Sequence, residues 1–132
     1  MDYNYKNLLK EAMQVSQNAY APYSKFKVGA VVVYESGEHY SGCNVENVSY
    51  GLSLCAERNA ISTALAKGEK TKIKYIVVYS PNQKRCMPCG ACRQWIAEFA
   101  TKETKVILED ENDNILELAL EDIFPNAFLI EG

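Results

Sequence analysis

The chain has 132 residues, 48% of them hydrophobic and 23% charged, which predicts one globular domain over residues 1–132 and excludes a disordered chain. No apolar run approaches the ~20 residues of a membrane span, and the N-terminus lacks the pattern of a signal peptide, so we expect a cytoplasmic protein without a membrane partner. The net charge of −3, without a basic stripe, disfavours a nucleic-acid partner.

The first half of the chain predicts a helix followed by two strands. Apolar residues recur at helical spacing over 3–20, where Asp2 can cap the helix and Pro22 ends it. Residues 26–34 are rich in β-branched side chains and too apolar for a half-exposed strand. After a turn, residues 39–48 are expected to form a second strand that ends in a polar loop.

The second half alternates between helical and strand patterns. The expected elements are a helix over 55–67, a strand over 73–80, a helix over 89–99, and strands over 104–109 and 114–118 around an acidic turn. Leu65 and Trp95 are expected to face the core. Alternation of this kind predicts an α/β fold in which helices cover both faces of a sheet.

Two short motifs open the two helices of the second half. One is residues 55–58, Cys-Ala-Glu-Arg, and the other is residues 88–92, Pro-Cys-Gly-Ala-Cys. Each follows a strand and begins a helix, which is where ligands bind in sheets of this kind. Their three thiols are one ligand short of a closed structural zinc site, and catalytic zinc sites keep that corner for water. Zinc lowers the pKa of such a water to roughly 7, and Glu57 is placed to move its proton.

The choice of ligands among five cysteines is open. Because the cysteines crowd between 43 and 92 in a chain expected in a reducing compartment, metal binding or catalysis is favoured over disulfides. We select Cys55, Cys89 and Cys92, since a metal-binding Cys-x-x-Cys commonly has its second member after a helix N-terminus. Cys86 with Cys89 is the competing pair, and Cys86 or Cys43 could instead close a structural site. Otherwise Cys86 is a bystander and Cys43 a small buried apolar residue.

Three thiolates on one divalent cation leave excess negative charge, which something positive should offset. Two helix N-termini supply part of it, and we expect Arg58 to hydrogen-bond a thiolate, with Arg93 as the other candidate. The alternative is that both arginines lie at the surface or at the edge of the core. Residues two apart lie on opposite sides of a helix, so Cys55 and Glu57 can face one pocket only if Cys55 lies at the irregular first turn.

The motifs match the H-x-E and P-C-x-x-C signature of zinc-dependent deaminases, with cysteine in place of histidine. More closely, the chain resembles the cytidine deaminases, the small homotetrameric enzymes that act on free nucleosides. Two further segments carry the resemblance, 44–47 (Asn-Val-Glu-Asn) and 124–128 (Phe-Pro-Asn-Ala-Phe). The resemblance implies a three-layer α-β-α sandwich around a mixed five-stranded sheet, with one zinc ion per subunit.

The resemblance also implies a reaction, the hydrolytic deamination of cytidine and deoxycytidine to uridine and deoxyuridine in pyrimidine salvage. Cys55, Cys89 and Cys92 would bind the zinc. Glu57 would take the proton of the zinc-bound water and deliver it to N3 of the base and to the leaving amine.

The substrate-binding residues that the resemblance implies are Phe26, Asn44, Glu46, Ala56, Tyr50 and Phe128. The polar pair, Asn44 and Glu46, would hold the ribose 3′-hydroxyl. Phe26 and Phe128 would pack on the base, and Tyr50 matches a loop position that family members send into a neighbour's active site. From the residues alone, the two phenylalanines could equally be core residues and the polar pair ordinary turn residues.

Two other functions compete with this interpretation. One is a related deaminase with a different cytosine-bearing substrate such as blasticidin S, against which the polar pair and Phe128 argue. The other is a non-catalytic binding module stabilised by zinc. Zinc content and the loss of cytidine absorbance would separate the three.

Overall fold

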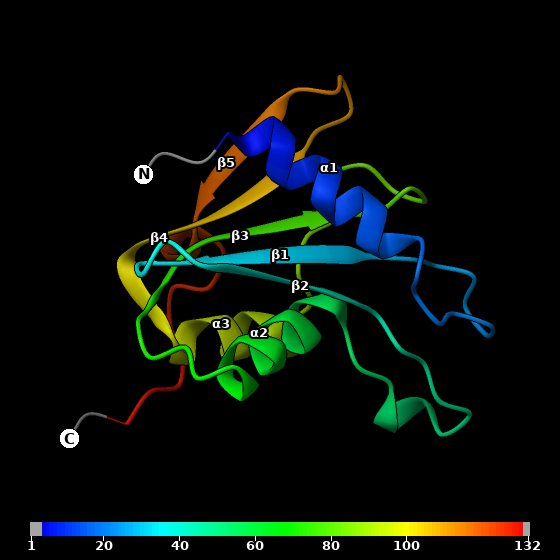
Figure 1. Ribbon diagram of the computed structural model, residues 1–132, viewed down its shortest axis with the longest axis horizontal. Coiled ribbons are helices and arrows are strands. Elements are labelled where there is room, and N and C mark those ends of the chain that lie inside the picture. Colours follow the sequence, from blue (N-terminus) through cyan, green and yellow to red (C-terminus); the bar gives the residue numbers. More distant parts are fainter. Residues whose placement is uncertain (1–3, 131–132) are drawn as a thin grey trace.

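The computed structural model describes residues 4–130, which form a five-stranded sheet with helices on both faces (Figure 1). The elements in chain order are α1 (Tyr5–Ser16), β1 (Gly29–Tyr34), β2 (His39–Cys43), the 3-10 turn η1 (Tyr50–Leu52), α2 (Ala56–Ala66), β3 (Ile73–Tyr79), α3 (Gly90–Glu98), β4 (Ala100–Glu109), β5 (Ile115–Ala119) and α4 (Leu120–Ile123). Helix α1 covers one face of the sheet, and α2 and α3 lie side by side on the other (Figure 1). The predicted three-layer α/β sandwich is confirmed. None of the helices described is long and apolar enough to cross a membrane.

The strands lie in the order β2-β1-β3-β4-β5, and the sheet is mixed, as predicted. Strand β1 is antiparallel to both β2 and β3, whereas β4 is parallel to β3 and antiparallel to β5. A parallel pair requires a crossover connection, and α3 provides it between β3 and β4. The segment 80–89 therefore leaves the carboxyl end of β3 and leads into the start of α3.

Strand β1 lies at the centre of the core and is buried along its whole length. Its side chains alternate between the two faces, as a strand requires. Ala30 and Val32 pack in the cluster on the side of α2 and α3, and Val31 and Val33 pack in the cluster under α1. Burial on both faces explains why the sequence here is continuously apolar rather than alternating.

Both ends of α1 differ from the sequence prediction. The N-cap is Asn4, whose side chain accepts a hydrogen bond from the backbone of Lys6 at 2.9 Å, while the predicted cap Asp2 lies outside the described residues. The helix ends at Ser16 rather than near 20. After it the chain leaves the helix, so that Tyr20 can bridge Val45 in the loop after β2.

Two apolar side chains that we expected in the core are on the surface. Leu65 on α2 is 42% exposed and Trp95 on α3 is 38% exposed. The adjacent residues Ala64 and Ile96 are fully buried in their place. Consecutive helical residues point about 100° apart, so a prediction that is one residue out exposes a large side chain.

A buried carboxylate joins the turn between β1 and β2 to the loop after α2. Glu69 is 7% exposed and accepts hydrogen bonds from Ser36 Oγ at 2.9 Å, Tyr40 Oη at 3.0 Å and both the backbone and the hydroxyl of Thr71. Desolvation raises the pKa of Glu69, but the hydrogen bonds from these partners outweigh it, and the pKa lies below its ordinary value. The carboxylate is thus the stable form in the folded protein.

Candidate active site

Cys55 lies at the N-cap of α2 and Glu57 in the first turn of that helix. The backbone of Cys55 is extended, with φ −76° and ψ 156°, so its side chain does not follow the helical periodicity. This irregular start lets the thiol of Cys55 and the carboxylate of Glu57 line one cavity, although the residues are two apart. Gly42 on β2 packs against the first turn of α2. Because glycine has no Cβ atom, the backbones of strand and helix come close together there.

Cys89 lies at the equivalent position of α3. It is the N-cap residue, and its sulfur accepts a hydrogen bond from the backbone N–H of Cys92 at 3.4 Å. Cys92 follows in the first turn and is buried. The unpaired N–H groups and positive dipole end of each helix favour thiolates at these two starts.

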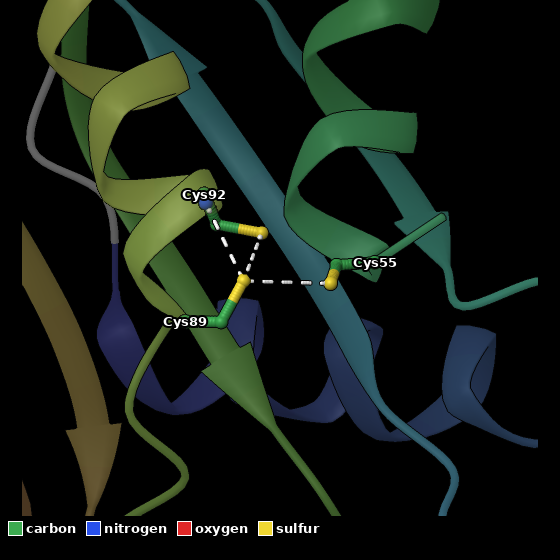
Figure 2. Close-up of side chains that lie close together, drawn as sticks. All are labelled: Cys55, Cys89 and Cys92. Atoms are coloured by element: carbon green, nitrogen blue, oxygen red, sulfur yellow. Dashed lines mark hydrogen bonds between the residues drawn. The ribbon is translucent and has the colours of Figure 1, made fainter. Parts of the chain in front are cut away.

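The two helix starts bring three sulfur atoms together (Figure 2). The sulfur of Cys89 lies 3.6 Å from that of Cys55 and 3.3 Å from that of Cys92, and all three lie within 4.8 Å of one another. A tetrahedral zinc ion with Zn–S bonds of ~2.3 Å would hold its sulfurs about 3.8 Å apart. The spacing and the soft donor set therefore fit zinc. Among the described residues, neither Cys43 nor Cys86 belongs to this group.

The three thiols share charge with each other and with one arginine. A guanidinium nitrogen of Arg58, Nη2, donates to the sulfur of Cys55 at 3.4 Å. Hydrogen bonding from Cys92, and then from Arg58, holds the pKa of Cys55 well below its ordinary value. The hydrogen bond with Cys55, together with burial, raises the pKa of Cys92. Such a group holds protons that a divalent cation would displace.

The other arginine that we considered serves a different purpose. Arg93 donates from Nε to the carbonyl of Pro88 and from Nη1 to the carbonyl of Ile123, both at 2.8 Å. It ties the loop before α3 to the end of α4. Through these two carbonyls it positions the second cysteine motif by way of the backbone.

Glu57 is 3% exposed and lies beside the thiol group without being part of it. Burial is the main cause that raises the pKa of Glu57 to about 7, and the neighbouring charge of Cys55 acts in the same direction. A carboxyl group with such a pKa can both accept and release a proton near neutral pH.

A cavity of about 350 Å³ opens above Glu57. It is lined by Ser24, Phe26, Val28, Asn44, Glu46, Ser53, Leu54, Cys55, Ala56, Glu57, Cys86, Met87 and Cys89. Of the expected site residues, Phe26, Asn44, Glu46 and Ala56 thus share one cavity with Glu57 and with the thiols of Cys55 and Cys89. The lining residues include two carboxylates and no lysine or arginine.

Asn44 and Glu46 follow β2, and both side chains bond to the segment that leads into β1. Asn44 donates from Nδ2 to the carbonyl of Phe26 and accepts at Oδ1 from the backbone of Val28, both at 2.8 Å. Strand β1 begins at Gly29 rather than at 26, and the side chain of Asn44 holds the segment that leads into it. Hydrogen bonding from Ser24 is the main cause that lowers the pKa of Glu46.

Tyr50 and Phe128 do not line this cavity in their own chain. Each is 74% exposed. The ring of Tyr50 lies 5.9 Å from that of Tyr23, and the backbone of Phe128 exchanges two hydrogen bonds with the side chain of Gln94. A single chain therefore leaves these two aromatic rings open to contact from outside.

Sequence reasoning missed several residues of the cavity wall, chiefly Ser24, Leu54 and Met87, and assigned Cys86 no place in it. Ser24 carried a usable signal, because a serine in a turn commonly hydrogen-bonds nearby backbone groups. Leu54 and Met87 carried none, since they are apolar residues in loops.

Comparison with known proteins agrees with this geometry. Residues 2–108 match the family model described as the cytidine and deoxycytidylate deaminase zinc-binding region. The chain belongs to this family. A zinc-binding region defines the family, and the three-thiol group of this chain fits one zinc ion.

Relatives and solved structures cover nearly the whole chain. The cytidine deaminase of Halalkalibacterium halodurans is 41% identical over 124 residues, which span 94% of this chain and 93% of that protein. The cytidine deaminase of Sporosarcina psychrophila is 39% identical over 93% of this chain and 90% of its own length. A crystal structure of cytidine deaminase from Burkholderia pseudomallei superposes with a TM-score of 0.87 at 39% identity, covering 96% of this chain and all of that one.

Proposed function

We propose that the protein is a zinc-dependent cytidine deaminase, which hydrolyses cytidine to uridine and ammonia. The observation that carries this proposal is the position of Glu57, a buried carboxyl group beside three clustered thiols at the floor of a cavity. A structural zinc site would leave such a carboxyl without a partner or a purpose. The relatives named cytidine deaminase support the same conclusion.

Cys55, Cys89 and Cys92 would hold the zinc ion. Bound zinc supplies a Lewis acid that makes a water molecule acidic enough to be a nucleophile at neutral pH. Glu57 would accept one proton of that water as the water oxygen bonds to C4, and would pass this proton to N3 of the pyrimidine. It would then move the remaining proton of the same oxygen to the amino group, so that the C4–N bond breaks, ammonia leaves and the carbonyl of uridine forms. Burial, which raises the pKa of Glu57, suits a carboxyl group that must both accept and release a proton. Arg58 stabilises the negative charge of the Cys55 thiolate.

The remaining cavity residues would bind the nucleoside. Asn44 and Glu46 would hold the 3′-hydroxyl of the sugar, and Phe26 would pack against the base. Ala56, at the first position of α2, would present its backbone to the base near Glu57. This set suits a cytosine nucleoside better than a blasticidin-like compound, because a nucleoside offers the polar pair a sugar hydroxyl to bind.

The family also includes deoxycytidylate deaminases, whose substrates carry a 5′-phosphate. A phosphate is normally bound by arginine, lysine or a helix N-terminus. The two helix N-termini at this cavity are occupied by the thiols of Cys55 and Cys89, its lining offers no lysine or arginine, and its Glu46 would repel an anion. The composition of the cavity therefore favours free nucleosides, both cytidine and deoxycytidine, over nucleotides.

We also propose that this single-domain chain, residues 1–132, assembles as a homotetramer in which neighbouring subunits complete each cavity. Exposed apolar side chains around η1 support this, since Val48, Tyr50 and Leu52 are all more than two-thirds exposed on one loop beside the cavity. Tyr50 and Phe128 would each contribute an aromatic ring to a completed cavity. All five cysteines are free of disulfide bonds, which is typical of a reducing compartment and supports a cytoplasmic enzyme of pyrimidine salvage.

The test is direct. The purified chain is assayed for zinc content, and cytidine is followed by its loss of absorbance together with release of ammonia. Deoxycytidine, deoxycytidine monophosphate and blasticidin S are assayed separately in the same way, as alternative substrates. One zinc per chain with turnover of the two nucleosides supports the proposal. A zinc-loaded protein that turns over none of them would overturn it in favour of a binding module.

A further inference from the structure

The hydroxyl group of Ser24 joins two parts of the cavity wall that lie on different segments. It donates a hydrogen bond to Oε2 of Glu46, and it accepts one from the backbone N–H of Phe26 at 3.0 Å. Ser24 itself lines the cavity. One side chain therefore connects the carboxylate on the loop after β2 with the aromatic residue before β1.

The remaining bonds of Glu46 leave it little freedom. Its other oxygen, Oε1, accepts from the backbone N–H groups of Tyr23 at 3.0 Å and Ser24 at 3.1 Å. A carboxylate has about four acceptor positions, and three are used here. Within residues 4–130 no group bonds to the fourth position, which lies on the oxygen that Ser24 also contacts, so it can accept from one hydroxyl group of a ligand. The direction of that acceptor depends on the bond from Ser24.

The loop that carries Ser24 is held in an unusual conformation. Lys25 has a φ of +62°, a left-handed backbone that lysine rarely adopts. This turn brings the N–H of Phe26 back to the hydroxyl of Ser24, while Asn44 holds the carbonyl of Phe26 from the other side. Phe26 is thus fixed at both ends by groups that are themselves part of the cavity.

We propose that Ser24 is a positioning residue for sugar recognition: its hydroxyl orients the Glu46 carboxylate so that the single free acceptor position meets the sugar hydroxyl of the nucleoside. The inference rests on the proposed function. It assigns Ser24 no contact with the reacting atoms. Its effect reaches the substrate through Glu46, and its bond to Phe26 couples that orientation to the wall against which the base packs.

The experiment compares cytidine with 2′,3′-dideoxycytidine, which lacks the 2′- and 3′-hydroxyl groups of the sugar. In Ser24→Ala, kcat/KM for cytidine falls about 10- to 100-fold, mainly through KM, as expected for loss of a hydrogen bond to a charged group. The value for dideoxycytidine falls much less, so the preference for cytidine shrinks about tenfold. Ser24→Thr retains a hydroxyl and restores the preference. Ser41→Ala, on β2 away from this cavity, is the matched control and leaves it unchanged.

A double-mutant cycle separates positioning from a structural role. If Ser24 acts through Glu46, then Ser24→Ala no longer changes the substrate preference in a Glu46→Ala background. An equal loss for both substrates in Ser24→Ala, or a full effect in the Glu46→Ala background, would overturn the inference while leaving the deaminase proposal intact. A zinc-loaded wild-type protein without cytidine turnover would overturn both.

Discussion

Gly42 lies where the backbone of β2 passes close to that of α2. Replacing it with alanine should displace α2 and so move an active-site residue without altering any residue of the cavity. A Cβ atom at Gly42 would lie 2.5 Å from the backbone nitrogen of Ala60 and 2.9 Å from the carbonyl oxygen of Ala56. Ordinary contact begins near 3.4 Å, so strand and helix must separate by almost 1 Å. The obstructing atoms are backbone, which cannot move aside as a flexible side chain would. Helix α2 would therefore shift, and it carries Glu57.

Two effects of different size follow from this shift. Overpacking costs about 1–3 kcal/mol in the free energy of unfolding, which lowers Tm by roughly 4 °C for each kcal/mol in a chain of this length. Misplacing a catalytic group by about 1 Å costs on the order of 10²-fold in rate. We therefore expect Gly42→Ala to remain folded at moderate temperature but to lose about 10²-fold in kcat.

Val31→Ala is the matched control. Val31 is fully buried on β1 but faces α1, on the side of the sheet away from the thiols. Removing its methyl groups should cost a similar 1–3 kcal/mol without moving α2. Both variants are compared by thermal unfolding with zinc in excess and by kcat with saturating cytidine. If Gly42→Ala kept near wild-type kcat, or if Val31→Ala lost as much, the close packing of β2 on α2 would not be what positions Glu57.

Three further predictions concern the buried carboxylate, the metal and the sugar contact. Because the pKa of Glu69 is lowered on folding, its stabilisation is complete above its ordinary pKa and is lost as the pH falls through the lower native value. Glu69→Gln should therefore lower the free energy of unfolding by about 2–3 kcal/mol at neutral pH. Urea titrations should show this difference from the wild type shrinking below about pH 4.5. A difference in unfolding free energy that stays constant with pH would contradict this. Removing zinc with a chelator should lower Tm and make Cys55, Cys89 and Cys92 reactive toward a thiol reagent, whereas unchanged melting and reactivity would argue against a metal at these residues. Glu46→Ala should raise KM for cytidine at least tenfold with zinc content unchanged, and an unaltered KM would remove Glu46 from substrate binding.

The outline of the site could be predicted because its chemistry is local in the sequence. Cys55 and Glu57 are two residues apart, and Cys89 and Cys92 belong to one helical turn. Strand patterns before each motif and helical patterns after it placed both at the same edge of the sheet. The ambiguity between Cys86 and Cys89 as the first ligand of the second motif needed the structure, because both offer a Cys-x-x-Cys spacing.

The rest depends on contacts that sequence patterns do not encode. The predicted helix continued past Ser16 because the apolar spacing continues, whereas the structure turns the chain so that Tyr20 can bridge Val45. Trp95 was placed in the core by its size and apolar character alone. The bonds from Ser24 to both Glu46 and Phe26 link segments about twenty residues apart, which only the folded loop reveals.

The most direct measurement of the central claim is turnover by Glu57→Gln with its metal content known. Glutamine has the shape of glutamate but cannot carry the proton, and Glu57 is not one of the three clustered thiols. We expect the variant to fold and to contain as much zinc as the wild type, while kcat for cytidine falls by about 10²–10⁴-fold or more. A zinc-loaded Glu57→Gln protein that deaminates cytidine at close to the wild-type rate would contradict the assignment of Glu57 as the group that moves the proton.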